Sequence, residues 1–303
     1  MRASLIEDLY PSRYAATPSL VERLDPVVHG AWTTGADQPL SRHDLQSYED
    51  NGYLSFAGFF SAAELRPYQE ELTRLRARDD VKTWQEVILE PGTQEVRSIF
   101  YIHQTNEVLS QLLRHRRILA IVKQLLGSEV YIHQSRINYK PGFEGKEFYW
   151  HSDFETWHIE DGMPRMRALS CSISLTENNE HNGPLMVIPG SHKSYVTCVG
   201  ETPEEHYKSS LQKQEYGVPD HDSMRRLVEQ GGIDAPKGPA GSITFFDCNI
   251  MHGSSSNITP WPRSNIFCVY NSVENALVEP FGGHKPRPEF IATRQDSSPL
   301  QPV

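Results

Sequence analysis

The sequence predicts a mainly β fold with flanking helices, built on a double-stranded β-helix, the jelly-roll or cupin-like core. Short runs of apolar and β-branched residues, separated by Gly and Pro, dominate the chain beyond residue 130. Two longer amphipathic stretches precede these runs and predict helices. The chain has 303 residues and 38% hydrophobic content, enough for one substantial core. We therefore expect a single domain over residues 1–303.

The first part of the chain is expected to contain an irregular arm followed by a helix. Residues 1–40 carry prolines and few periodic apolar positions, which favours an N-terminal arm that wraps over the core. Ser61 and Glu64 have the spacing of a capping box, and Phe60 and Leu65 are placed for a hydrophobic staple. This combination predicts the start of an amphipathic helix.

Further elements follow in order along the chain. Apolar pairs at helical spacing over residues 106–126, with Gly127 after them, predict a second helical region. Residues 194–238 are polar and helix-prone, and we expect them to form an insertion near the barrel mouth. A lid and an ordinary surface excursion fit this composition equally well. The predicted strands lie at residues 130–140, 168–175, 185–188, 242–246 and 266–271.

Composition excludes several classes of partner. The net charge of −10 argues against binding to nucleic acid or to an anionic membrane surface. No stretch approaches the roughly 20 apolar residues that span a bilayer, and the first residues have no apolar run of signal-peptide length. The four cysteines lack C-x-x-C spacing, so we expect reduced thiols in a cytoplasmic protein.

The run FYWHSDFETWH at residues 148–158 predicts a metal site. If His151 and Asp153 lie on one strand, alternation sends both side chains to the same face. A histidine from a neighbouring strand, His252, can then complete a two-histidine, one-carboxylate face that holds Fe(II) and leaves positions open for a co-substrate and oxygen. An isolated H-x-D motif is weak in a chain with 13 histidines, so the surrounding sequence has to agree.

Two further patterns agree with the metal site. Residues 182–192 form a short apolar strand closed by a Pro-Gly turn, and residues 241–247 form a strand that leads towards His252. Arg263 lies eleven residues beyond that histidine, on the strand that follows. An arginine in that place can grip a dicarboxylate bidentately, which suits the far carboxylate of 2-oxoglutarate. The alternative is that Arg263 is an ordinary surface arginine with no role in ligand binding.

This ordered set of motifs resembles the phytanoyl-CoA dioxygenase superfamily of Fe(II)- and 2-oxoglutarate-dependent oxygenases. The set comprises H-x-D, then G-x-L-x-V-x-P-G-S-H at residues 183–192, then the distal histidine and the arginine. Residues 48–60 are similar to the first helix and strand of that superfamily, and the resemblance covers nearly the whole chain. The carboxylate of Asp153 argues against a halogenase, in which a halide needs that position.

Within the superfamily, the chain resembles the ectoine hydroxylases. The stretch FYWHSDFETWHIEDGMP at residues 148–164 is similar to their signature, and so are residues 8–13 and 287–292. The resemblance implies hydroxylation of ectoine to 5-hydroxyectoine, with Fe(II) as the metal, 2-oxoglutarate and O2 as co-substrates, and succinate and CO2 as co-products. This reaction belongs to the synthesis of an osmolyte used in stress responses.

One face of the strand at residues 130–140 is polar throughout and reads Gln134, Arg136, Asn138 and Lys140. Such a face usually meets solvent, but in a jelly roll it can also line the interior. The resemblance implies that Gln134 contacts the substrate ring and that Lys140 contacts 2-oxoglutarate. Arg136 and Asn138 are neighbouring candidates for binding the co-substrate.

Aromatic residues are candidates for the walls of a substrate pocket. Ectoine is a cyclic zwitterion, so its amidinium suits an aromatic face and its carboxylate suits hydrogen-bond donors. Trp157 would share the face of Asp153 if the strand continued, and the resemblance implies that it positions the substrate. Phe267 is a second candidate wall. Core packing is the alternative for both residues.

Three other functions fit the same motifs. A related dioxygenase could hydroxylate another small polar metabolite, such as a free amino acid, with the same iron site. A zinc hydrolase could use the triad, although it would not need the arginine after the distal histidine. A non-catalytic jelly-roll binding protein could keep the metal for structure alone. A homodimer is a further expectation.

Overall fold

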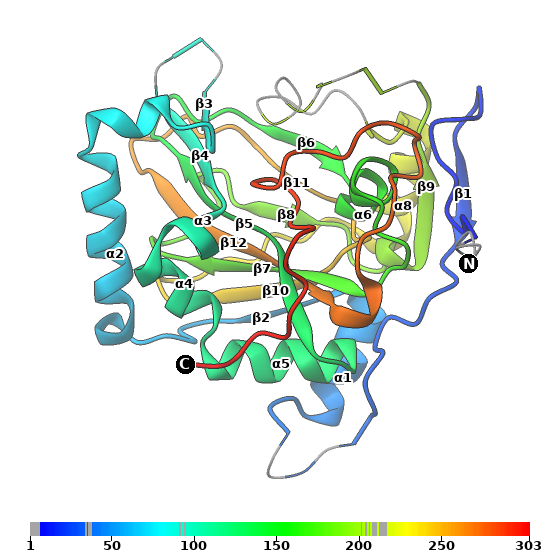
Figure 1. Ribbon diagram of the computed structural model, residues 1–303, viewed down its shortest axis with the longest axis horizontal. Coiled ribbons are helices and arrows are strands. Elements are labelled where there is room, and N and C mark those ends of the chain that lie inside the picture. Colours follow the sequence, from blue (N-terminus) through cyan, green and yellow to red (C-terminus); the bar gives the residue numbers. More distant parts are fainter. Residues whose placement is uncertain are drawn as a thin grey trace.

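The computed structural model describes residues 7–33, 35, 38–90, 92–93, 95–200, 202–203, 205, 207, 211 and 217–303. Within them, a seven-stranded antiparallel sheet faces a three-stranded one, and helices cover the outer side of the larger sheet (Figure 1). In spatial order the larger sheet contains β2 (Tyr53–Phe56), β10 (Ile243–Asp247), β7 (Ala168–Ser174), β12 (Arg263–Ser272), β5 (Val130–Lys140), β4 (Val96–Phe100) and β3 (Val87–Leu89). The predicted jelly roll is confirmed.

The smaller sheet carries most of the metal motif. It consists of β6 (Phe148–His151), β11 (His252–Ser254) and β8 (Leu185–Val187). A separate pair joins β1 (Ser19–Glu22) of the N-terminal arm to β9 (Ser194–Thr197). All five predicted strands are present, and β12 begins three residues before its predicted start, at the arginine that follows the distal histidine.

The predicted helices are present, with one correction. Ser61 and Glu64 form the reciprocal capping box of α2, and Gly127 ends α5 in the left-handed conformation. The region 106–126 is two helices rather than one, because His115 accepts a hydrogen bond from Arg117 N and so starts a new helix. The helices are α1 (Arg42–Asn51), α2 (Ala62–Arg76), α3 (Ile102–Thr105), α4 (Glu107–Leu113), α5 (Arg116–Leu126), α6 (Asp153–Thr156) and α8 (His221–Gly231). Short helical turns lie at η1 (Asp79–Thr83), η2 (Trp157–Asp161), η3 (Ser191–Lys193) and η4 (Val273–Asn275).

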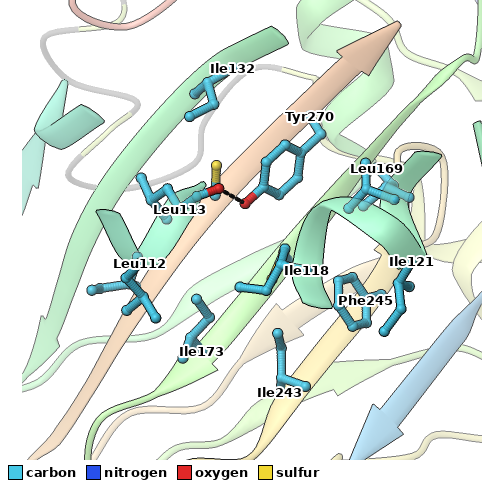
Figure 2. Close-up of a cluster of buried hydrophobic side chains, with 14 of the residues drawn as sticks. Leu112, Leu113, Ile118, Ile121, Ile132, Leu169, Ile173, Ile243, Phe245 and Tyr270 are labelled. Carbon is cyan, nitrogen blue, oxygen red and sulfur yellow. Dashed lines mark hydrogen bonds between the residues drawn. The ribbon is translucent and has the colours of Figure 1, made fainter. Parts of the chain in front are cut away.

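The main hydrophobic core lies between the helices and the outer face of the larger sheet (Figure 2). Leucine and isoleucine side chains of α4 and α5 pack there against alternate residues of β7, β10 and β12. The hydroxyl of Tyr270 donates to the carbonyl of Leu113 at 2.7 Å, which ties strand to helix. The apolar stripes of the helices therefore serve packing, and the inner face of the sheet is left for polar residues.

A β-bulge in β5 decides which of its residues face the interior. Val269 pairs with Gln134 and Tyr270 pairs with Ile132, so His133 is the extra residue. Beyond the bulge the odd-numbered residues, such as Ile137, join the core against the helices. The polar face from residue 134 to residue 140 therefore points between the two sheets, and it is not a solvent face.

The described residues of the N-terminal arm are irregular apart from β1. The arm is also well anchored, since Tyr10 is fully buried and its hydroxyl donates to Asp25 at 2.9 Å. Of the predicted excursion 194–238, β9 and α8 are described, and residues 201, 204, 206, 208–210 and 212–216 lie outside the described residues. The four cysteines are free and buried. Among the described helices, each is too short or too polar to cross a membrane.

Candidate active site

His151, Asp153 and His252 come together between the two sheets. The two histidines lie opposite each other on β6 and β11, and their ring centroids are 4.2 Å apart. His151 Nε2 lies 3.6 Å from Asp153 Oδ1, and His252 Nε2 lies 3.7 Å from Asp153 Oδ2. One ligand atom from each residue lies within 4.8 Å of the other two. The predicted triad is thus assembled with its three donor groups converging.

The expected strand geometry of the motif is wrong in one respect. β6 ends at His151, and Asp153 is the first residue of α6, so strand alternation does not place it. The backbone turns at Ser152, and Phe154 N donates to Cys248 O at 2.8 Å, which holds the start of α6 against the segment before β11. The carboxylate reaches the histidines through this turn. Trp157 accordingly lies in the helical turn η2, not on a continued strand.

Backbone carbonyls fix both imidazole rings. His151 Nδ1 lies 2.7 Å from Tyr149 O, and His252 Nδ1 lies 3.1 Å from Ile250 O. Because a carbonyl oxygen only accepts hydrogen bonds, each Nδ1 carries the proton and each Nε2 presents its lone pair to the centre. Burial and the neighbouring His151 lower the pKa of His252 to about 4, which favours the neutral, ligating form.

This donor set fits a ferrous ion. Two neutral imidazole nitrogens and one carboxylate on one side are the ligands typical of non-haem Fe(II) oxygenases. Burial opposes ionisation of Asp153, but the imidazoles of His252 and His151 and the guanidinium of Arg136 hold the pKa of its carboxyl below the ordinary value. Asp153 is therefore available as an anionic ligand. Ser170 Oγ donates to its Oδ2 at 3.2 Å and orients it.

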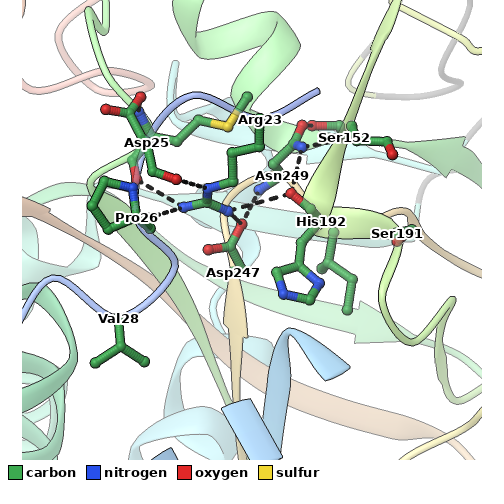
Figure 3. Close-up of polar contacts among 12 residues, drawn as sticks. Arg23, Asp25, Pro26, Val28, Ser152, Ser191, His192, Asp247 and Asn249 are labelled. Carbon is green, nitrogen blue, oxygen red and sulfur yellow. Dashed lines mark hydrogen bonds and ion pairs between the residues drawn. The ribbon is translucent and has the colours of Figure 1, made fainter. Parts of the chain in front are cut away.

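Arg23 of the N-terminal arm contacts residues next to the ligand-bearing segments (Figure 3). The buried guanidinium of Arg23 pairs with Asp247 at 2.8 Å, and the same Oδ1 accepts from Asn249 N at 2.8 Å. Asn249 Oδ1 in turn accepts from the hydroxyl of Ser152 at 3.0 Å. Ser152 lies between two members of the triad, and Asn249 lies three residues before the third. The arm thus helps to fix the segments that carry the ligands.

A cavity beside the triad is lined by cationic and amide side chains from the larger sheet. Arg136, Asn138 and Arg263 line it, together with both histidines. Lys140 reaches its edge, since Nζ donates to the lining residue Ser254 at 2.8 Å and to Ser255 O at 2.6 Å. Arg136, Arg263 and Lys140 form no ion pair with any described carboxylate. Cations gathered in this way favour an anionic ligand.

Burial disfavours the charged forms of these side chains. Burial, with the positive charges of Arg263 and Arg97, lowers the pKa of Lys140 to about 6. Burial and Arg97 lower the pKa of Arg263 to about 10, and burial lowers the pKa of Arg136 as well. An anion in the cavity would reverse these shifts, because an opposite charge within a few ångströms favours the charged form.

The remaining predicted site residues differ in whether they line the cavity. Phe267 lines the cavity, and the guanidinium carbon of Arg136 lies 5.3 Å from its ring centroid. Gln134 donates to Ile291 O at 2.9 Å and accepts from Arg136 at 3.2 Å. Trp157 is 3% exposed, and its indole meets the His133 ring edge-on at 5.2 Å. Among the described residues, the cavity lining includes neither Gln134 nor Trp157.

Sequence reasoning missed the ionic groups around these residues. Arg97 is fully buried, pairs with Glu90 at 2.7 Å and lies over the ring of Phe148, which lines the cavity. Arg13 of the arm pairs with Glu155 at 2.6 Å, next to the triad. No strand was predicted over β4, so the sequence patterns did not single out Arg97. Arg13 lay in a segment that was noted for its similarity alone.

Comparisons with known proteins agree with this site. The family model described as Phytanoyl-CoA dioxygenase (PhyH) matches residues 48–265. Proteins named ectoine dioxygenase from Bordetella bronchiseptica and Sphingopyxis alaskensis are each 54% identical to this chain, over 98% of it and 96% of theirs.

Solved structures give the same result. The crystal structure of EctD from S. alaskensis with 2-oxoglutarate and 5-hydroxyectoine has a TM-score of 0.89 and 49% identity, covering 98% of each chain. The crystal structure of the same enzyme with bound Fe has a TM-score of 0.87 and 48% identity, again over 98% of each chain. The chain therefore belongs to the phytanoyl-CoA dioxygenase family and, within it, to the ectoine dioxygenases.

Proposed function

We propose that this protein hydroxylates ectoine to 5-hydroxyectoine with Fe(II), 2-oxoglutarate and O2, and releases succinate and CO2. The observation that carries the proposal is the convergence of His151, Asp153 and His252 beside a cavity lined by unpaired cations. Relatives of this chain are named for the same reaction, and a similar structure holds 2-oxoglutarate and 5-hydroxyectoine.

The triad would hold the iron through His151 Nε2, His252 Nε2 and the carboxylate of Asp153. When bound, the iron supplies the activation of oxygen and the oxidative decarboxylation of 2-oxoglutarate. The chain itself keeps both imidazoles neutral and oriented through their Nδ1 contacts to carbonyl oxygens. It also holds the site between two sheets, where the three ligand side chains are largely shielded from solvent.

The cationic side of the cavity would bind 2-oxoglutarate. Arg263 presents a planar guanidinium that can pair bidentately with the distal carboxylate, and Lys140 adds a second positive charge. Asn138 and Arg136 lie between that end and the triad on β5, so they would contact the rest of the dianion. A co-substrate with two negative charges suits this cluster better than a monoanion.

Ectoine would bind at the other end of the same polar strand. Phe267 offers an aromatic face to the amidinium ring, and Gln134 lies at that end with its amide already oriented by hydrogen bonds. Trp157 is packed in the turn that follows Asp153. Through this packing it would help to fix the shape of the pocket. This arrangement would bring one C–H bond of the ring to the open side of the triad.

The cellular setting and assembly are also proposals. Four free, buried cysteines support a reducing, cytoplasmic location. We propose one catalytic domain over residues 1–303, with 194–238 as an insertion near the barrel mouth, that forms a homodimer. Light scattering of the purified protein measures its mass directly. A monomer mass would exclude the dimer and leave the catalytic proposal intact.

The test is anaerobic loading with Fe(II) and 2-oxoglutarate, followed by oxygen with and without ectoine, and mass spectrometry of the products. We expect succinate and a product one oxygen heavier than ectoine in equal amounts. Succinate with a hydroxylated amino acid, but not with ectoine, would favour the related dioxygenase. With verified iron loading, no succinate from any substrate would exclude the oxygenase and leave a zinc hydrolase or a binding protein.

A further inference from the structure

A second β-bulge lies between β3 and β4, at one edge of the larger sheet. Ile88 of β3 pairs with Ser98, and the next residue, Leu89, pairs with Val96. Arg97 is therefore the extra residue of β4, and a bulge of this kind often re-aims a side chain next to an active site. The side chain of Arg97 points between the two sheets, where it contacts the smaller one.

The contact of Arg97 with the smaller sheet is made at the start of β6. Arg97 Nη2 donates to Glu147 O at 3.0 Å, and its guanidinium carbon lies 4.1 Å from the ring centroid of Phe148. Phe148 is the first residue of β6, the strand that ends at His151, and it lines the cavity beside the triad. One buried side chain of the larger sheet thus holds both the strand start and a wall of the cavity.

Phe148 lies at the end of the cavity where the unpaired cations gather. It is the register partner of Ser254 on β11, whose hydroxyl accepts from Lys140 Nζ at 2.8 Å. Arg263 is in turn the register partner of Lys140 on β12. This is the end proposed for 2-oxoglutarate, whereas ectoine is proposed to bind towards Gln134.

Glu90 fixes the guanidinium of Arg97. Its Oε2 accepts from Arg97 Nη1 at 2.7 Å, and both side chains are buried. Desolvation offsets much of the attraction within a buried ion pair, so such a pair often contributes no more stability than apolar residues of similar volume. Arg97 Nε and Glu90 Oε1 also lack a hydrogen-bond partner in the described part of the chain. Stability alone therefore does not account for this pair.

We propose that Arg97 is a positioning residue for 2-oxoglutarate. Glu90 would hold the guanidinium, and the guanidinium would hold the ring of Phe148 against the space that the dianion occupies. Arg97 is not among the residues that line the cavity, so it would act through Phe148 and not by direct contact. The inference rests on the proposed function, which places 2-oxoglutarate at this end of the cavity.

The experiment measures the Kd for 2-oxoglutarate of the Fe(II)-loaded protein by calorimetry without oxygen. The variant is Arg97→Met/Glu90→Gln, which removes both charges and leaves neither one buried alone. We expect the Kd to rise about tenfold, because the ring of Phe148 loses the cation that holds it. The KM for 2-oxoglutarate should rise with it, whereas the KM for ectoine and the iron content should stay constant.

A double-mutant cycle with Phe148→Leu tests whether Arg97 acts through this ring. Once the ring is absent, Arg97→Met/Glu90→Gln should weaken binding by a further factor of about two or less. If the Arg97→Met/Glu90→Gln variant does not fold, Arg97→Lys takes its place in the cycle. A lysine keeps the charge beside Glu90 but lacks the planar group that lies over the ring.

The matched control is Arg78→Met/Asp80→Asn. Arg78 also pairs with a carboxylate, at 2.6 Å, and also lies over a ring, 4.8 Å from that of Trp84, but its side chain is 40% exposed. Its removal should leave the Kd for 2-oxoglutarate unchanged.

The outcomes separate this inference from the proposed function. If the wild-type protein binds 2-oxoglutarate and the Arg97 variants bind it equally well, only the positioning role is overturned. A loss of affinity that adds in full to that of Phe148→Leu would overturn it too. A wild-type protein that binds no 2-oxoglutarate would overturn the proposed function as well.

Discussion

Two buried ionic regions flank the triad, and they differ in whether their charges have partners. On one side, Arg13 pairs with Glu155 and with Glu160, at 2.6 and 2.8 Å, and Arg287 pairs with Asp161 at 2.5 Å. We call this the paired region. On the other side, Arg136, Lys140 and Arg263 have no described carboxylate partner, and we call this the unpaired region.

The pKa shifts of the arginines follow the same division. Burial opposes the charge in both regions, but in the paired region the carboxylates of Glu155 and Asp161 raise the pKa values of Arg13 and Arg287. In the unpaired region burial prevails and lowers the pKa values of Arg136 and Arg263. The paired region is complete without a ligand and serves structure. In our proposal, a bound dianion would supply the negative charge that the unpaired region lacks.

The largest expected effect is on stability, from Arg13→Met in the paired region. This change leaves Glu155 buried without its cation, and breaking a buried pair in this way costs about 3–5 kcal/mol. We expect the free energy of unfolding, measured by urea denaturation, to fall by about that amount. The Kd for 2-oxoglutarate of the folded fraction should change little. An unaltered denaturation midpoint would contradict the assignment of the paired region to structure.

The matched change in the unpaired region, Arg263→Met, should have the opposite profile. It removes a buried cation that has no carboxylate partner among the described residues and donates to Asn265 Oδ1, so the denaturation midpoint should stay constant or rise. Binding of 2-oxoglutarate should weaken roughly 100-fold, because truncating one partner of a buried charge pair typically costs about 2–5 kcal/mol. A lower denaturation midpoint with an unchanged Kd for 2-oxoglutarate would show that Arg263 serves structure and not binding.

A smaller effect concerns proton uptake by Lys140. Its pKa is about 6 in the free protein, so the amine is largely neutral above that pH. A bound dianion raises that pKa again, so binding takes up a proton and the affinity for 2-oxoglutarate falls as the pH rises above about 6. The slope is at most about tenfold per pH unit. Calorimetry in two buffers of different ionisation enthalpy measures the uptake, and Lys140→Met should abolish it.

The smallest effect is expected at the surface and sets the baseline for both regions. Arg167 pairs with Glu274 at 2.6 Å, but the glutamate side chain is 62% exposed. Glu274→Gln should change the free energy of unfolding by about 0.5 kcal/mol or less, because exposed ion pairs contribute little. If Glu274→Gln lowered the free energy of unfolding as much as Arg13→Met, burial would not be the reason why the ion pairs of the paired region contribute more to stability.

The sequence allowed much of this architecture to be predicted, because the signals were local. The capping box at Ser61, the stop at Gly127 and the alternation in residues 130–140 each depend on a few neighbouring residues. The histidines and Asp153 came from motif spacing, although their strand geometry was wrong. Arg263 followed from its distance to the distal histidine, within a strand that could be recognised.

The remainder depends on contacts between distant parts of the chain. Arg13 and Glu155 are 142 residues apart in the sequence, and Arg23 and Asp247 are 224 residues apart, so no local sequence pattern predicts either ion pair. The bulge at His133 is a property of pairing with β12, and it reverses the phase of β5 without a Gly or Pro to mark it. The break between α4 and α5 depends on one histidine cap.

The central claim is that the unpaired cations hold a dianion beside the triad. The most direct measurement is a crystal structure of the Fe(II)-loaded protein, grown without oxygen in the presence of 2-oxoglutarate. We expect iron bound by His151, Asp153 and His252, and the distal carboxylate of 2-oxoglutarate hydrogen-bonded to Arg263. A 2-oxoglutarate molecule bound at the iron with its distal carboxylate away from Arg263 and Lys140 would contradict the account.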